Sequence, residues 1–242
     1  MSNVGMSKYR IEKHPGHSFK LVYLKTISAQ LHFLSLVAGL YGLWLFIAAP
    51  QVQGWDLVAC CIFAIAGCTT MLVSSTYHFM SDGFKLTPHF DLILENLDHF
   101  TIYFFIAGTY TPFLRKILAE PWRTYLLTAV WITAILGVLY TLFKPKLPKW
   151  AQSRVVYTGI FLAMGWILIF RIGEAWTKMT AQNAAYLLLG GLSYSIGAVI
   201  YIMKKPNPIP NIFGFHEIWH VAVSGGFLFH YLLVYDLYVR GM

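Results

Sequence analysis

Two histidines four residues apart open the last apolar segment of the chain, at His216 and His220 in GFHEIWHVAV. Residues four apart on a helix share one face, with their Cβ atoms about 5–6 Å apart, so both side chains can reach one metal ion. Further polar pairs stand at the ends of two other apolar segments, namely Ser74 with His78 and Glu95 with Asp98. We therefore expect these three segment ends to meet around one zinc ion.

A zinc ion held by His78, His216 and His220 would keep its double charge and a fourth position open to water, which is the usual pattern of a catalytic site. Such a water ionises at a pKa of roughly 7 rather than about 15.7, which makes it a nucleophile for an ester or amide carbonyl. We expect Asp98 to accept the proton and orient this water. Ser74 lies one turn before His78 and could hydrogen-bond to the water or to a substrate oxygen.

The composition indicates the environment in which such a site would lie. The chain of 242 residues is 57% hydrophobic and 12% charged, which is about half the charge content of a soluble domain. Its net charge of +8 comes from residues in short loops between apolar runs rather than from a basic stripe. These features predict a membrane protein with no nucleic-acid partner.

Seven apolar stretches approach the roughly 20 residues that a membrane-spanning helix needs. They are Ile27 to Ala49, Trp55 to His78, Leu97 to Leu114, Tyr125 to Phe143, Val155 to Phe170, Ala184 to Met203 and Phe215 to Tyr238. We predict an all-α integral membrane bundle of seven transmembrane helices, with a cytoplasmic tail at 1–26 and a zinc-binding domain at 27–242. Pro112 predicts that the third helix is broken or displaced near its end.

Lysine and arginine counts predict the orientation, because cytoplasmic loops carry the excess of these residues. With seven spans, 12 of the 18 lie on the side of the N-terminus, among them Lys85, Lys146 and Lys204. The N-terminus is therefore expected in the cytoplasm and the C-terminus outside. The same topology brings His78, Asp98, His216 and His220 to one depth, near the cytoplasmic face.

Other residues allow alternative interpretations. His32 and His230 also fall within apolar stretches, where a single histidine is more often a packing residue than a ligand, so neither is assigned to the site. The letters HEIWH match the HExxH pattern of zinc proteases, with Glu217 as general base. Proteases of this kind usually need a third metal ligand downstream. The downstream carboxylate here, Asp236, would lie about 24 Å along the helix from His220, too far to bind the same ion.

The motifs resemble the haemolysin III family, the bacterial branch of the progestin and adiponectin receptor (PAQR) proteins. They are S-x-x-x-H at Ser74 to His78, E-N-x-D-H at Glu95 to His99 and H-x-x-x-H at His216 to His220, and the resemblance extends from Lys20 to Tyr238. It implies seven helices, a cytoplasmic N-terminus and zinc on three histidines, carried over as His78, His216 and His220. It also implies that Asp98 holds the zinc-bound water beside Ser74. Related alkaline ceramidases hydrolyse the amide bond of ceramide.

The favoured function is a zinc-dependent, ceramidase-like hydrolase of a lipid amide or ester, located in a bacterial inner membrane. The alternative is a non-catalytic sensor or regulator of membrane lipid or energy homeostasis, in which zinc is structural. A membrane lipid is the expected partner in either case, as substrate or as ligand. A cytolysin and an intramembrane protease are less favoured, and the sequence decides neither the substrate nor the oligomeric state.

Overall fold

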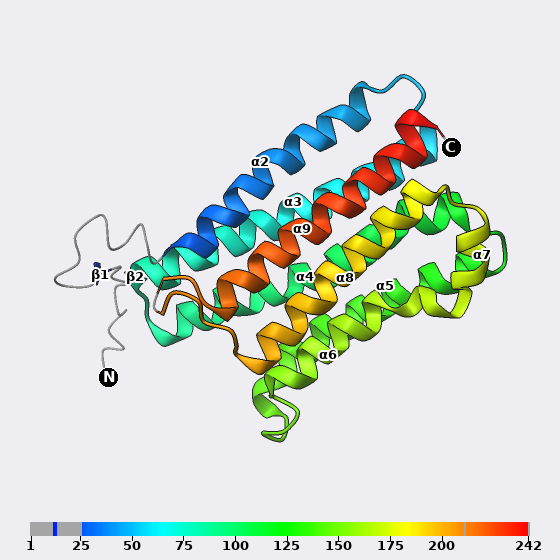
Figure 1. Cartoon of the computed structure of the whole chain (residues 1–242). Helices are drawn as coiled ribbons and strands as arrows, with labels where there is room; N and C mark the ends of the chain where they lie inside the picture. Colours follow the sequence, from blue (N-terminus) through cyan, green and yellow to red (C-terminus); the bar gives the residue numbers. More distant parts are fainter. Residues whose placement is uncertain (1–11, 14–25, 211, 242) are drawn as a thin grey trace, which may run out of the picture.

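The computed structural model describes residues 12–13, 26–210 and 212–241, so most of the predicted tail at 1–26 lies outside the described residues (Figure 1). Seven long helices account for most of this part of the chain. They are α2 (Ile27–Ala48), α3 (Gly54–Gly83), α4 (Pro88–Ile117), α5 (Trp122–Phe143), α6 (Arg154–Gly165), α8 (Ala181–Met203) and α9 (Phe215–Tyr235). The shorter elements are β1 (Glu12–Lys13), which pairs antiparallel with β2 (Phe84–Lys85), η1 (Lys144–Lys146), η2 (Ile167–Arg171), α7 (Ile172–Thr177) and the π-helical turn η3 (Asp236–Arg240).

Six helical segments within the described residues are long and apolar enough to cross a membrane. The remaining long helix, α4, has a lower mean hydropathy because it carries acidic residues in its first half and basic residues in its last turn. It is nevertheless 30 residues long, or about 45 Å, and it lies within the bundle beside the other six. The prediction of an all-α membrane bundle is confirmed.

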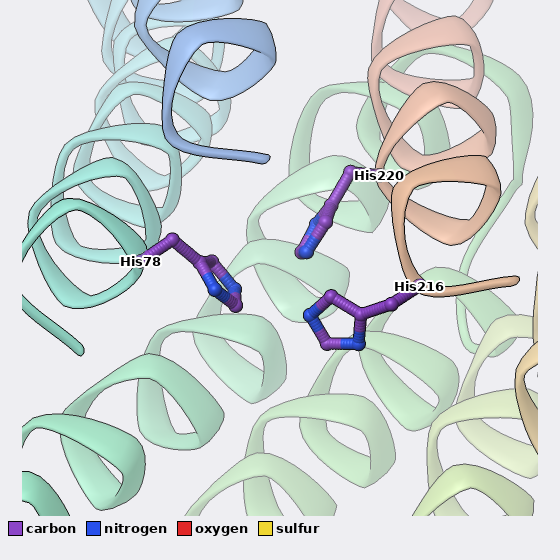
Figure 2. Close-up of side chains that lie close together, drawn as sticks. All are labelled: His78, His216 and His220. Carbon is purple, nitrogen blue, oxygen red and sulfur yellow. The ribbon is translucent and has the colours of Figure 1, made fainter. Parts of the chain in front are cut away.

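The helices form a closed ring in which each packs against the next along the chain, and α9 closes the ring against α2. The last helix also contacts α3 and α4, so it has neighbours on several sides (Figure 1). The start of α9, the end of α3 and the starts of α2 and α4 all lie at the same end of the bundle (Figure 1). Histidines from α3 and α9 come together there (Figure 2).

Polar contacts hold α2 and α9 in one register from the site end toward the bundle centre. Ser28 donates to Glu217, His32 contacts His220 and Ser35 donates to Ser224, at 3.2, 2.5 and 2.8 Å. The contacts recur about once per helical turn along both helices. In a membrane, apolar side chains gain little by leaving lipid tails for another helix, because both surroundings are apolar. Hydrogen bonds between helices therefore contribute to helix association.

Two helices differ from the sequence-based expectations. The third helix is not broken at Pro112, because α4 continues to Ile117. The carbonyl oxygen of Pro112 accepts a hydrogen bond from the Tyr238 hydroxyl at 2.9 Å, which ties this end of α4 to η3. The fifth span is interrupted instead, because α6 ends at Gly165 and the chain continues as η2 and α7. Tyr110 donates to the Gly165 carbonyl at 2.5 Å at this interruption.

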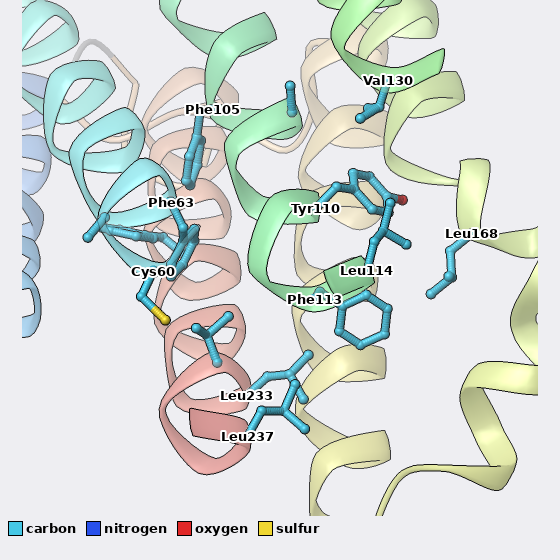
Figure 3. Packing of buried hydrophobic residues seen from close by; sticks show 14 of the residues in the cluster. Cys60, Phe63, Phe105, Tyr110, Phe113, Leu114, Val130, Leu168, Leu233 and Leu237 are labelled. Carbon is cyan, nitrogen blue, oxygen red and sulfur yellow. The ribbon is translucent and has the colours of Figure 1, made fainter. Parts of the chain in front are cut away.

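The apolar core lies mainly between α3, α4, α5 and α9 (Figure 3). Phe63 on α3 and Phe105 on α4 both pack their rings against Phe227 of α9, with centroid distances of 5.6 and 5.2 Å. Leu114 and Leu233 are almost completely buried in the same cluster. This packing fixes α3, α4 and α9 relative to one another, and these helices carry the candidate site residues.

Candidate metal centre

Three imidazoles converge at the shared end of α3 and α9. His78, His216 and His220 each offer a ring nitrogen, and these three atoms lie within 4.8 Å of one another. Figure 2 shows the rings pointing toward a common centre, His78 from one side and the two α9 histidines from the other. The ring centroids are 4.5–5.0 Å apart. This buried cluster of three nitrogen donors could bind a metal ion.

The depth of the cluster differs slightly from the expected one. Helix α3 continues five residues beyond His78 to Gly83, and α4 begins at Pro88, ten residues before Asp98. His78 and Asp98 therefore lie one to three helical turns inside their helices, whereas His216 is at the start of α9. Thr87 and Pro88 explain the early start of α4, because the Thr87 hydroxyl caps the helix and proline is favoured in its first turn.

Glu217 fixes the start of α9 and holds it to α2. Its Oε2 accepts a hydrogen bond from the Gly214 backbone N–H at 2.7 Å, and its Oε1 accepts one from the Ser28 hydroxyl at 3.2 Å. Both carboxylate oxygens are thus engaged in positioning the helix. This arrangement satisfies an exposed N–H at the helix terminus and provides no support for Glu217 as the base of a protease motif.

His78 is supported by a carboxylate that the sequence analysis did not assign. The Nδ1 atom of His78 lies 3.3 Å from Oδ2 of Asp82, one turn later on α3. A metal-binding histidine commonly makes such a contact through its second nitrogen, which orients the ring. The H-x-x-x-D spacing was a signal for this residue, because residues four apart on a helix share a face.

His220 has a partner of its own in His32, which the sequence analysis treated as a packing residue. His32 Nε2 lies 2.5 Å from His220 Nδ1, and the two rings meet edge to face with centroids 4.4 Å apart. His32 was recognisable by depth, since it lies five residues after the start of α2 at the same end of the bundle. His230, by contrast, packs against Tyr194 farther along α9.

Asp98 and Ser74 lie beside the histidine cluster. Both residues line a cavity of about 260 Å³ that His220 also lines. Among the described residues, Asp98 Oδ1 and His220 Nε2 are buried without a hydrogen-bond partner. A buried polar atom left in this way is costly, so a metal ion and a water would fit the two atoms.

Glu95 points to a different neighbour. Its Oε1 lies 3.8 Å from Nζ of Lys144, which places its carboxylate toward α5 and η1. The expectation that Glu95 meets the zinc cluster together with Asp98 is therefore not supported. Asp98 lies three residues farther along α4, and the two side chains leave the helix about 60° apart.

Two hollows border the cluster. The 260 Å³ cavity extends between α4, α6, α8 and α9 and is lined mainly by apolar and aromatic side chains, including Phe105, Phe161 and Leu192. A second hollow of about 460 Å³ is lined by His78, His216, Asp82, Asn207 and other residues near the end of the bundle. His220 thus borders an apolar cavity, and His78 and His216 border a more polar one.

The fold and this site define a class of protein, an integral membrane helical bundle with a buried three-histidine cluster at one end. The sequence profile described as haemolysin-III related matches residues 24–231. The chain therefore belongs to the haemolysin-III related family, and the resemblance inferred from the three motifs is confirmed.

Individual relatives agree with this assignment. A haemolysin-3 homologue from Bacillus subtilis (strain 168) is 35% identical over 179 residues, covering 74% of this chain and 76% of the relative. Haemolysin-3 from Bacillus cereus is 35% identical over 152 residues, covering 62% and 64%. A more distant match is an adiponectin receptor protein from Drosophila melanogaster, 24% identical over 228 residues, or 87% of this chain and 50% of that protein.

Proposed function

We propose that this protein is a zinc-dependent hydrolase that cleaves an amide or ester bond of a membrane lipid. The observation that carries the proposal is the unpartnered Asp98 carboxylate oxygen in an apolar cavity shared with His220 of the histidine cluster. Three nitrogen ligands favour zinc and leave a fourth position free. Zinc bound there would lower the pKa of a water to about 7 and polarise the scissile carbonyl.

The side chains around the cluster have separate roles in this proposal. Asp98 accepts a proton from the attacking water, whose oxygen forms a bond to the carbonyl carbon of the lipid. The carbon–nitrogen bond of the amide then breaks, and Asp98 returns the proton to the leaving nitrogen, so that a fatty acid and an amine result. Ser74 hydrogen-bonds to Asp98 or to the substrate oxygen, and the apolar side chains of the cavity bind the acyl chain.

The same proposal places the protein in a bacterial inner membrane with its site near the cytoplasmic face. The similarity to two Bacillus proteins supports a bacterial membrane, and the excess of lysine and arginine at the site end supports the orientation. In that orientation the polar hollow at His78 and His216 opens toward the cytoplasm and admits zinc and water, while lipid enters the apolar cavity from the bilayer.

An Asp98→Asn variant tests the role of the carboxylate. It removes the proton acceptor but keeps the size of the side chain, so we expect zinc to remain bound and turnover to fall by roughly 10²–10⁴-fold. The measurement is hydrolysis of a panel of ceramides and lipid esters in nanodiscs, with zinc quantified in each sample. Glu95→Gln is the matched control on the same helix, because its carboxylate faces Lys144, and its turnover should equal that of the parent.

A regulator with structural zinc is the competing function, favoured by the similarity to a protein named as a receptor. In that case Asp98 would complete a closed set of four ligands, and the lipid in the cavity would be a ligand rather than a substrate. A zinc-loaded parent that hydrolyses no lipid of the panel, together with an Asp98→Asn variant that loses its zinc, would favour the regulator.

A further inference from the structure

We infer that His32 is a positioning residue that holds the His220 ring with an unprotonated Nε2 facing the cluster, and that Met71 sets this arrangement. The inference rests on the metal site of the proposed function, but not on hydrolysis. It concerns three buried side chains that contact one another in series. They are Met71 on α3, His32 on α2 and His220 on α9.

The direction of the hydrogen bonds follows from the chemistry of Met71. Its Sδ lies 3.0 Å from His32 Nδ1, and a thioether sulfur can only accept a hydrogen bond. His32 Nδ1 therefore carries a proton and donates. A second proton on this ring would place an uncompensated charge in a buried apolar setting, which is costly, so His32 Nε2 is left as an acceptor.

The contact between His32 and His220 determines which ring nitrogen of His220 carries the proton. His32 Nε2 lies 2.5 Å from His220 Nδ1, so His220 must donate through Nδ1. A neutral imidazole has one N–H, and its Nε2 then carries the lone pair. His220 Nε2 is buried and has no hydrogen-bond partner among the described residues, and His220 belongs to the three-histidine cluster. This series of hydrogen bonds therefore leaves the lone pair of His220 Nε2 free to bind a metal ion.

The position of His32 is fixed by its surroundings. His32 and Met71 are 2% and 0% exposed, so both side chains are held inside the bundle. His32 also occupies one place in the series of α2–α9 contacts, between the Ser28–Glu217 and Ser35–Ser224 pairs. Metal-binding histidines commonly donate to a carboxylate, a carbonyl or a water, as His78 does toward Asp82. For His220 a second imidazole takes this place.

Zinc affinity of purified variants in detergent, measured by competition with a chromogenic chelator, tests the inference. His32→Leu removes the acceptor, and we expect zinc to bind about 10–100-fold more weakly. His32→Gln keeps an oxygen near the position of Nε2 and should recover most of the affinity. Met71→Leu preserves the packing but removes the sulfur acceptor, so its affinity should fall between those of the parent and His32→Leu.

Two further measurements separate positioning from folding. Ser35→Ala removes the neighbouring α2–α9 contact without touching His220, and its zinc affinity should equal that of the parent. Cobalt(II) in place of zinc reports the ligand geometry by its visible spectrum, which should change in His32→Leu and return toward that of the parent in His32→Gln. Thermal unfolding without metal shows whether each variant is folded.

The inference would be overturned if His32→Leu bound zinc as tightly as the parent, or if His32→Gln bound zinc no more tightly than His32→Leu. It would also be overturned if Ser35→Ala lowered the zinc affinity as much as His32→Leu. A parent that binds neither zinc nor cobalt would overturn this inference and the proposed function together. A parent that binds zinc with the expected order among the variants, yet hydrolyses no lipid, would overturn the hydrolase alone.

Discussion

At the scale of single residues, the three cluster histidines should control metal content. His78→Ala, His216→Ala and His220→Ala each remove one of three converging nitrogens, so each variant should lose most of the roughly one zinc per chain expected for the parent. The measurement is elemental analysis of purified protein. His89→Ala is the control, because His89 is an exposed histidine at the start of α4. Full zinc occupancy in any of the three cluster variants would contradict the assignment of that ligand.

Two adjacent serines on α3 provide a second test at this scale. Ser74 lines the cavity beside Asp98, whereas Ser75 donates to the Ala29 carbonyl of α2 at 2.9 Å. Ser74→Ala should therefore lower lipid turnover about 10–100-fold with little loss of stability. Ser75→Ala should retain turnover and lower the free energy of unfolding by about 1 kcal/mol. Turnover and thermal unfolding of both variants check this, and equal turnover in the two would remove Ser74 from the site.

The cluster residues could be predicted because the spacing of residues along a helix determines which side chains share a face. His216 and His220 share a helix face, and counting spans placed His78 and Asp98 at their end of the bundle. His32 and Asp82 were missed for different reasons. A lone histidine in an apolar stretch has no sequence partner, so its contact with His220 depends on the register of α2 against α9. Asp82 follows His78 by four residues, but it lies beyond the apolar stretch expected to end there.

At the scale of helices, adjacent glycines on α8 should respond in opposite ways to alanine. A Cβ at Gly190 would come within 2.3 Å of the His230 ring on α9, while a Cβ at Gly191 would have no such neighbour within 4 Å. Gly190→Ala should destabilise the bundle by about 1–3 kcal/mol through overpacking. Gly191→Ala should be neutral or stabilising by up to about 1 kcal/mol, because alanine favours the helix.

Thermal unfolding in detergent, compared between these two variants and the parent, checks the α8–α9 contact. A Gly190→Ala variant as stable as the parent would show that the two helices do not approach closely at His230. The sequence alone does not distinguish Gly190 from its neighbour Gly191. That distinction depends on the rotation of α8 about its axis, which is set by contacts with α6 and α9.

The helix ends that lie outside the apolar stretches could not be predicted from the sequence. Apolar stretches located all seven long helices, since hydrophobic length is what a bilayer selects. The polar turns of α3 after His78 and of α4 before Leu97 have no such signal, yet they are helical. They continue because α3 and α4 pack against each other, and the β2 connection between them is short. The result is that His78 and Asp98 lie one to three turns inside their helices.

At the scale of the whole molecule, two features determine how the site meets its surroundings. The histidine cluster lies at the end of the bundle opposite the C-terminus (Figure 1). It borders both a polar hollow and an apolar cavity. Exposed leucine, isoleucine and aromatic side chains cover the outer faces of α2, α5 and α8, as expected for surfaces in contact with lipid. If a lipid binds as proposed, its head and its acyl chain have separate environments beside the cluster, one polar and one apolar.

The orientation of this arrangement in the membrane is the last prediction. The excess of lysine and arginine at the site end predicts that this end lies in the cytoplasm, where positive loops are retained. Fusions of alkaline phosphatase, which is active only outside, and of green fluorescent protein, which fluoresces inside, can be made after Lys85, Glu120 and Met242. We expect fluorescence after Lys85, and phosphatase activity after Glu120 and Met242. The Lys85 and Glu120 fusions also flank α4, the helix with the lowest hydropathy, so opposite reporters there would show that it crosses the membrane. The reverse pattern at all three positions would move the cluster to the outer face, and the same reporter at Lys85 and Glu120 would contradict seven crossings.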